Sequence, residues 1–261
     1  MERINLVDFQ KRKLKNFFVC VYVITKKIKI RTETSIAERD LNLLYGIDIF
    51  GYRQVLGIYF DNTHNNRFWL EKFEDLKARN VEKILFFISP GNKNLERCIK
   101  IIYNDVKIVY SPDNIFQKIT QFFAEHPSRK MQISLKNLFL AETEEEYKSD
   151  LEFFKDFYVD NKLIMILLEK NEPLISEFYQ YSHDLRTLFY PYYTIREMQK
   201  KLNKLNTLNN LCTNINEVIE FCLPIINSFE IGRNTSRLEW LKFVSNLYEQ
   251  FPNELEEYIN G

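Results

Sequence analysis

The feature that most constrains the fold is an uninterrupted apolar run near the start of the sequence. Residues Phe17–Ile24 read FFVCVYVI, and β-branched and aromatic side chains follow one another without a polar break. A membrane-spanning helix needs about 20 such residues, so this run is too short to be one. A continuous apolar run of this length is typical of a strand buried on both faces. The rest of the chain must therefore cover both sides of this strand.

Three further segments near the run have the pattern of strands. In Lys26–Arg31, isoleucines alternate with basic residues, which predicts a half-buried strand with a basic outer face. Leu43–Ile49 and Gln54–Phe60 are joined by a short Phe50–Tyr52 connection that contains a glycine. We expect these segments to form an antiparallel meander with the first strand.

The pattern then alternates between helices and strands. Asn65–Arg79 and Leu95–Ile102 have apolar residues at helical spacing, and Ile84–Ile88 and Val106–Val109 are short apolar strands. Such alternation favours parallel strand pairing, so a mixed sheet is expected.

After Pro112 the sequence predicts helices only. Glycine and proline number 6 and 7 among 261 residues, which disfavours a turn-rich β-sandwich and favours long helices. The expected fold class is therefore α/β, with strands first and helices last. The helical segments are Asn114–Glu125, Ile133–Leu140, Glu144–Phe157, Lys162–Tyr179, Asp184–Lys204, Ile215–Phe229 and Thr235–Glu257.

Charge and cysteine content limit the classes of partner and cofactor. The chain has 36 basic and 36 acidic residues, whereas proteins that bind the phosphate backbone are usually basic. Its 4 cysteines form no CxxC pair, so we expect buried free thiols and neither a zinc site nor disulfides. With no leader sequence or membrane span recognised, the expected location is the cytoplasm, without membrane association.

Local motifs of common enzyme classes are missing from the sequence. It has no phosphate-binding glycine loop and no nucleophile elbow. His64 and His183 each have a single nearby carboxylate, Asp61 and Asp184, and we interpret both histidines as structural.

Two consecutive segments carry a more specific pattern. Tyr52–Lys77 reads YRQVLGIYFDNTHNNRFWLEKFEDLK, and Asn80–Gly91 reads NVEKILFFISPG. They resemble the catalytic region of bacterial Mutator-type transposases, with its pattern "F-W-L-E-x-x-x-D-L-K-x-R-G-V" and a strand ending in "V-S-D-G". Leu185–Lys204 is similar to the family segment "I-R-x-x-I-Y-T-T-N-A-I-E". The resemblance covers roughly residues 18–205, and no counterpart of the family's N-terminal DNA-binding region is recognised.

The resemblance implies an RNase H-like fold, a mixed sheet with flanking helices and an all-α insertion before the last catalytic element. It also implies two-metal phosphoryl chemistry, in which three acidic side chains hold divalent ions. The expected organisation is an N-terminal tail, a first core part, a helical insertion, a last core helix and a C-terminal helical extension. These segments are residues 1–16, 17–111, 112–184, 185–205 and 206–261.

The family's three acidic positions carry other residues in this chain. By the resemblance they fall on Ile24, Pro90 and Arg196, none of which can bind a cation. Glu197 follows the third position, but one helical residue turns a side chain by about 100° away from the site. We therefore predict a catalytically inactive core without a bound metal.

Three interpretations remain open for such a core. The first is a domesticated or decayed transposase, a pseudoenzyme that binds a protein partner or forms a homodimer, with Tyr192 and Tyr193 as candidate contacts. The second is weak binding of double-stranded DNA by Arg196, Lys200, Lys201 and Lys204, which recur at helical spacing. The third is a functional, DNA-binding transposase with displaced acidic residues, which would use Mg²⁺; no cofactor is expected otherwise.

Overall fold

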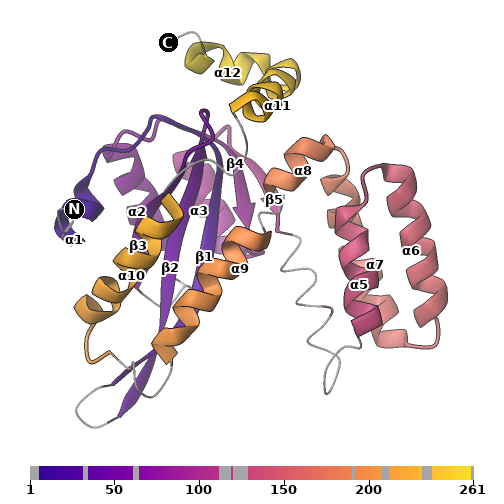
Figure 1. Cartoon of the computed structure of the whole chain (residues 1–261), viewed down its shortest axis with the longest axis horizontal. Coiled ribbons are helices and arrows are strands. Elements are labelled where there is room, and N and C mark those ends of the chain that lie inside the picture. Colours follow the sequence, from indigo (N-terminus) through magenta and orange to yellow (C-terminus); the bar gives the residue numbers. More distant parts are fainter. Residues whose placement is uncertain are drawn as a thin grey trace. The chain divides into compact units, whose positions relative to one another are not determined.

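Five strands form a single mixed sheet in the order β3-β2-β1-β4-β5 (Figure 1). The computed structural model describes residues 6–31, 35–60, 65–111, 119, 129–189, 192–206, 212–230 and 237–259. This arrangement confirms the expected α/β class and is compatible with an RNase H-like fold. The strands are β1 (Phe17–Arg31), β2 (Ile36–Asp48), β3 (Arg53–Phe60), β4 (Lys83–Ser89) and β5 (Lys107–Tyr110).

The central strand β1 is longer than expected. The sequence predicted separate strands at Phe17–Ile24 and Lys26–Arg31, and this division is wrong because β1 runs unbroken through Thr25. No turn-forming residue separates the two patterns, and β2 stays paired along the whole length, with Thr25 opposite Asn42. The antiparallel β1-β2-β3 meander and the parallel pairing of β1 with β4 are as predicted.

Two helices cover one face of the sheet and enclose its main core. They are α2 (Asn66–Ala78) and α3 (Lys93–Ile102), and they lie behind the sheet in Figure 1. Trp69 and Phe73 of α2 pack with Phe18, Val21 and other sheet residues that point to this side. Cys20, Tyr22 and Ile24 alternate with Val21 and therefore point to the opposite face, and a shift in the β1–β2 register between Phe18 and Cys20 explains why Phe18 lies on the same side as Val21.

The opposite face is covered by later parts of the chain (Figure 1). Helix α9 (Tyr192–Leu202) lies along β1, and the short 3-10 helix η1 (Asn203–Asn206) and α10 (Ile215–Glu230) follow it. The Asn206 side chain donates to the main-chain oxygen of Lys27 and accepts from the main-chain N–H of Lys29, in the part of β1 beyond its pairing with β4.

The last two helices close one end of the sheet. Phe251 packs edge-on against Phe86, and Tyr258 stacks on Phe17 with ring centroids 4.6 Å apart. The sequence predicted one helix over Thr235–Glu257, but the structure has α11 (Arg237–Gln250) and α12 (Pro252–Ile259). The break is explained by Pro252, which lacks an N–H and is favoured at the first position of a new helix.

A second compact unit, Val109–Tyr190, interrupts the first unit, which consists of Met1–Ile108 and Pro191–Gly261. Apart from Val109 and Tyr110, the last two residues of β5, its described part contains no strand, and none was predicted after Pro112. The expected helix Asn114–Glu125 lies outside the described residues. Tyr147 and Tyr179 stack inside it with centroids 4.4 Å apart. Its helices are α5 (Arg129–Leu140), α6 (Glu144–Tyr158), α7 (Lys162–Phe178) and α8 (His183–Phe189).

Two more segments of the chain differ from the pattern that the sequence predicted. Asp184–Lys204 is not one helix, because α8 ends at Phe189 and α9 begins at Tyr192, on either side of a proline that disfavours a continuous helix. The first residues, expected as a tail, contain the helix α1 (Leu6–Lys11), whose Phe9 is fully buried.

The cysteines and the hydropathy of the helices are consistent with the sequence. All four cysteines are free and buried, as predicted. Burial raises the pKa of Cys20 well above its ordinary range and that of Cys222 to about 12, so both stay protonated. No helix within the described ranges is long and apolar enough to span a membrane.

Candidate functional site at the carboxyl end of β4

The first two predicted site positions come shortly after the paired part of β1 and β4. In the parallel register of these strands, the last pair is Tyr22 opposite Ile88. Ile24 comes two residues later in β1, and Pro90 comes two residues later along the chain, directly after β4 ends at Ser89. Ile24 is 2% exposed, and the alternation along β1 places it on the face opposite α2 and α3. Neither side chain carries an oxygen or nitrogen lone pair that a cation could use.

The third position lies in the helix that covers these strands. Arg196 is part of α9, which lies against β1, and Tyr192 and Tyr193 form the start of the same helix. The residues predicted for the family's acidic positions therefore lie in β1, directly after β4 and in α9, all within one unit.

The basic residues of this region have partners within the protein. Lys200 Nζ pairs with a carboxylate oxygen of Glu197, so this acid faces a lysine one turn along α9. Lys201 Nζ donates to Ser228 Oγ at 3.1 Å and lies 4.7 Å from the ring centroid of Phe229. Lys204 lies in η1. Two of the lysines proposed for DNA contact thus make intramolecular bonds on an exposed surface.

One carboxylate returns to the end of β4 and was missed by sequence reasoning. Ser89 Oγ donates a 2.6 Å hydrogen bond to Glu96 Oε1, and Lys93 Nζ lies 3.1 Å from Glu96 Oε2. Glu96 is 7% exposed, although α3 is a surface helix. Sequence reasoning missed Glu96 because it lies six positions beyond Pro90, and the start of α3 brings it back to Ser89. Both Glu96 oxygens already have partners.

Asp48, a buried acid at the end of β2, stabilises the turn that leads to β3. Its Oδ1 accepts hydrogen bonds from the main-chain N–H groups of Phe50 and Tyr52, at 2.9 and 2.8 Å. Asp48 lies opposite Phe18, six residues before Ile24 along β1, which is a distance of about 20 Å. It cannot share a metal with the Ile24 position. Asp61 lies outside the described residues.

The residues of this site do not fit a two-metal centre. Hard divalent cations need several oxygen ligands, and a two-metal site shares them between ions about 4 Å apart. Within the described ranges, no three His, Cys, Asp or Glu side chains are grouped closely enough to hold an ion. Ile24 and Pro90 supply none of the required oxygens, and Glu96 supplies the carboxylate of a single residue.

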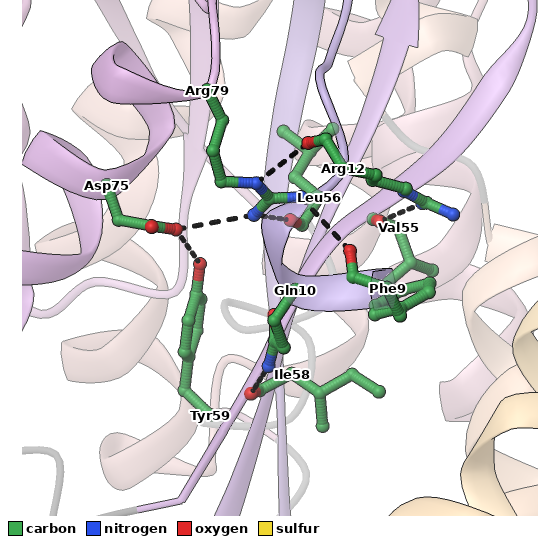
Figure 2. A network of polar contacts seen from close by, with 9 residues as sticks. All are labelled: Phe9, Gln10, Arg12, Val55, Leu56, Ile58, Tyr59, Asp75 and Arg79. Carbon is green, nitrogen blue, oxygen red and sulfur yellow. Dashed lines mark hydrogen bonds and ion pairs between the residues drawn. The ribbon is translucent and has the colours of Figure 1, made fainter. Parts of the chain in front are cut away.

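In contrast, the retained motif residue Arg79 is structural (Figure 2). Its guanidinium group is almost fully buried and donates to the main-chain oxygens of Leu56 at 2.6 Å, Arg12 at 3.0 Å and Phe9 at 3.4 Å. Asp75, one turn earlier on α2, pairs with it at 3.3 Å. Arg79 therefore ties the N-terminal segment and β3 to the end of α2, and this explains its place in the motif.

Arg186 plays the same part in the helical unit. It donates to the main-chain oxygens of Ala141 at 2.7 Å and Glu142 at 2.6 Å, and its guanidinium carbon lies 4.3 Å from the ring centroid of Tyr179. Burial lowers the pKa of Arg186 from its ordinary value, and the aromatic and carboxylate neighbours partly oppose this. Arg186 thus fastens α8 to the α5–α6 connection.

Comparison with known proteins assigns the chain to a family. The family described as "Transposase, Mutator family" matches residues 2–221. The transposase for insertion sequence element ISRM3 of Rhizobium meliloti (strain 1021) is 21% identical over 199 residues, which are 76% of this chain and 50% of that protein. The transposase for insertion sequence element IS1201 of Lactobacillus helveticus is 23% identical over 198 residues, which are 70% of this chain and 49% of that protein. The chain therefore spans about half the length of the curated relatives it matches.

Proposed function

Because the chain belongs to the Mutator family of transposases, we propose that it is a transposase-derived core that acts by binding and not by DNA strand transfer. One observation supports the proposal: the parallel pairing of β1 and β4 ends at Tyr22 opposite Ile88, two residues before Ile24 and Pro90, the positions at which the resemblance places family acids. An apolar side chain and a proline cannot bind the ions that activate the attacking hydroxyl and stabilise the leaving oxygen.

The roles of the remaining motif residues support this proposal. Trp69 and Leu76 fill the core between α2 and the sheet, and Arg79 and Arg186 bond main-chain oxygens. These residues maintain the fold, whereas the positions with a chemical role are replaced. A chain that keeps the scaffold and lacks the metal ligands is suited to a binding role, as in a domesticated transposase.

We favour a protein as the partner, with a second copy of the chain as the simplest case. The equal numbers of acidic and basic residues give no long-range field to attract DNA. In addition, Lys200 pairs with Glu197 and Lys201 donates a hydrogen bond to Ser228, so both lysines already have partners within the chain.

The predicted lack of catalysis is tested with purified protein and a DNA duplex that carries the end sequences of an insertion element whose transposase belongs to the same family. We expect no cleavage and no strand transfer in Mg²⁺ or Mn²⁺, while a full-length active relative assayed in parallel gives product. Metal-dependent product from this chain would refute the proposal.

The buried carboxylate of Glu96 favours a second candidate, a functional transposase with displaced acids. In that case metal-dependent cleavage is present, and Glu96→Gln abolishes it while leaving the circular dichroism spectrum unchanged. Ser89→Ala serves as the control, because it removes the hydrogen bond to Glu96 but keeps the carboxylate. We expect no activity in any of the three proteins.

Binding to DNA is tested by its salt dependence. If four phosphates were neutralised, the slope of log affinity against log salt would be about −3 to −4. Lys200→Glu/Lys201→Glu would then weaken binding to every sequence, because phosphate contacts carry no sequence information. We expect instead that the dissociation constant for DNA lies above the micromolar range at low salt. We also expect Lys200→Glu/Lys201→Glu to change this constant little.

A further inference from the structure

The outer surface of α5 and α6 exposes an unusual amount of apolar side chain. Ile133 and Leu140 of α5 are 51% and 46% exposed, and Phe153 and Phe157 of α6 are 56% and 50% exposed. The two phenylalanines lie one turn apart and stack with ring centroids separated by 6.3 Å. Contiguous exposed apolar patches, above all those with aromatic residues, commonly mark interaction surfaces.

The two helices also form one continuous surface. Lys130, at the start of α5, places its ammonium group 4.0 Å from the ring centroid of Phe157, near the end of α6. The helices are therefore antiparallel neighbours, and Ile133, one turn after Lys130, lies on the same side. We call this surface, formed by Lys130, Ile133, Leu140, Phe153 and Phe157, the α5–α6 face.

The α5–α6 face is bordered by opposite charges on its two sides. The sequence of α5 contains three basic residues and no acidic one. The sequence of α6 contains six acidic residues and two basic ones, and Glu145, Glu152 and Asp156 are exposed. On α6 the pKa of Asp150 is raised, first by desolvation and then by the negative charge of the nearby Glu146. The face is thus divided lengthwise into a basic and an acidic half.

We propose that the α5–α6 face is the site at which two copies of this chain associate, about a two-fold axis parallel to the helices. This operator places α5 of each copy over α6 of the other, so that basic and acidic halves meet on both sides of the axis. At the level of Lys130 and Phe157, it also brings Ile133 of one copy over the phenylalanines of the other. The inference rests on the proposed binding function and names its partner and surface.

The division of charge selects a second copy over other occupants. An extended polyanion such as duplex DNA would be repelled by α6, and a uniformly basic partner would be repelled by α5. A partner must carry an apolar stripe between an acidic and a basic helix, and an identical copy does so by symmetry. Self-complementary faces of this kind are the usual basis of two-fold homodimers.

The oligomeric state of the full chain tests the proposal by size-exclusion chromatography with light scattering and by sedimentation. We expect twice the 31.6 kDa chain mass at micromolar concentration. Phe153→Ser/Phe157→Ser should raise the dimer dissociation constant at least about tenfold, since a few aromatic residues dominate interface energies. Leu238→Ser/Leu241→Ser, two residues of α11 that are 65% and 54% exposed, is the matched control and should leave the mass unchanged.

Charge reversal tests the operator itself. Lys130→Glu/Lys136→Glu and Glu152→Lys/Asp156→Lys should each be monomeric alone and should form a heterodimer when mixed. Circular dichroism and thermal melts confirm that each variant is folded.

Three results would overturn the inference, and they differ in what they leave standing. A dimer that survives the phenylalanine substitutions would place self-association on another surface, and the proposed binding function would stand. A monomer at tens of micromolar would exclude a second copy as the partner. If the unsubstituted chain is a dimer but the two charge-reversed variants form no heterodimer when mixed, the two-fold arrangement is refuted. Metal-dependent strand transfer would instead refute the proposed function, whatever the oligomeric state.

Discussion

The indole Nε1 of Trp240 donates a 2.8 Å hydrogen bond to the main-chain oxygen of Ile49, which precedes it by 191 residues. The same ring covers Gly51, whose φ of 81° lies in the left-handed region. A Cβ atom at Gly51 would be 2.6 Å from Trp240 Cδ2, so the turn between β2 and β3 and the helix α11 fit only with glycine there. This contact fixes the last helices of the chain to the sheet.

Gly51→Ala should therefore destabilise the protein by about 2–4 kcal/mol, from backbone strain and the clash with the indole. Urea unfolding measures the loss. In a Trp240→Ala background the same substitution should lose only the strain component, about 1 kcal/mol. Equal effects in both backgrounds would show that the ring does not press on this turn.

Arg79→Met should destabilise the protein by about 3–5 kcal/mol, because it removes the Arg79 donors from the main-chain oxygens of Leu56, Arg12 and Phe9 and the ion-pair partner of Asp75. Arg67→Met is the control on the same helix: Arg67 is exposed and pairs with Glu71, so its loss should cost at most about 1 kcal/mol. Similar unfolding free energies for both variants would contradict the role assigned to Arg79.

The assignment of the family's first two acidic positions to Ile24 and Pro90 is tested by placing acidic residues there. Ile24→Asp/Pro90→Asp should lower the melting temperature, because it buries an unpaired carboxylate at a position 2% exposed. Millimolar Mn²⁺ should recover part of the loss by binding to the folded state, and the unsubstituted chain should not respond. The Asn/Asn variant controls for shape without charge. A melting temperature indifferent to Mn²⁺ would mean that the two positions do not converge.

Glu217 predicts a pH effect on the start of α10. Its carboxylate accepts hydrogen bonds from the N–H and hydroxyl groups of Thr213, both at 2.7 Å, and these lower its pKa from the ordinary 4.5. A depressed pKa stabilises the folded state above the unfolded value, and this stabilisation is lost as the pH falls through the folded value. The difference in melting temperature between the protein and Glu217→Gln should shrink below pH 4.5. NMR titration of Glu217 at or above 4.5 would disprove the shift.

Much of the fold was predictable because local patterns carry the information. The run Phe17–Ile24 predicted a central buried strand, and the meander followed from alternation and a short connection. At Asn80, φ is 84° where the family pattern has glycine, so the motif also marked a left-handed helix end. Proline explains why the predicted helices at Asp184–Lys204 and Thr235–Glu257 are each divided.

What the sequence by itself determined was the class of fold and the family, since these depend on order along the chain. Only the tertiary structure decided which residues meet. The return of Glu96 to Ser89, the burial of Arg79 under three main-chain oxygens and the contact of Trp240 with Gly51 join positions whose separation in sequence gives no periodic signal. Packing selects such contacts because buried polar groups and close-packed rings must find partners wherever the fold brings them.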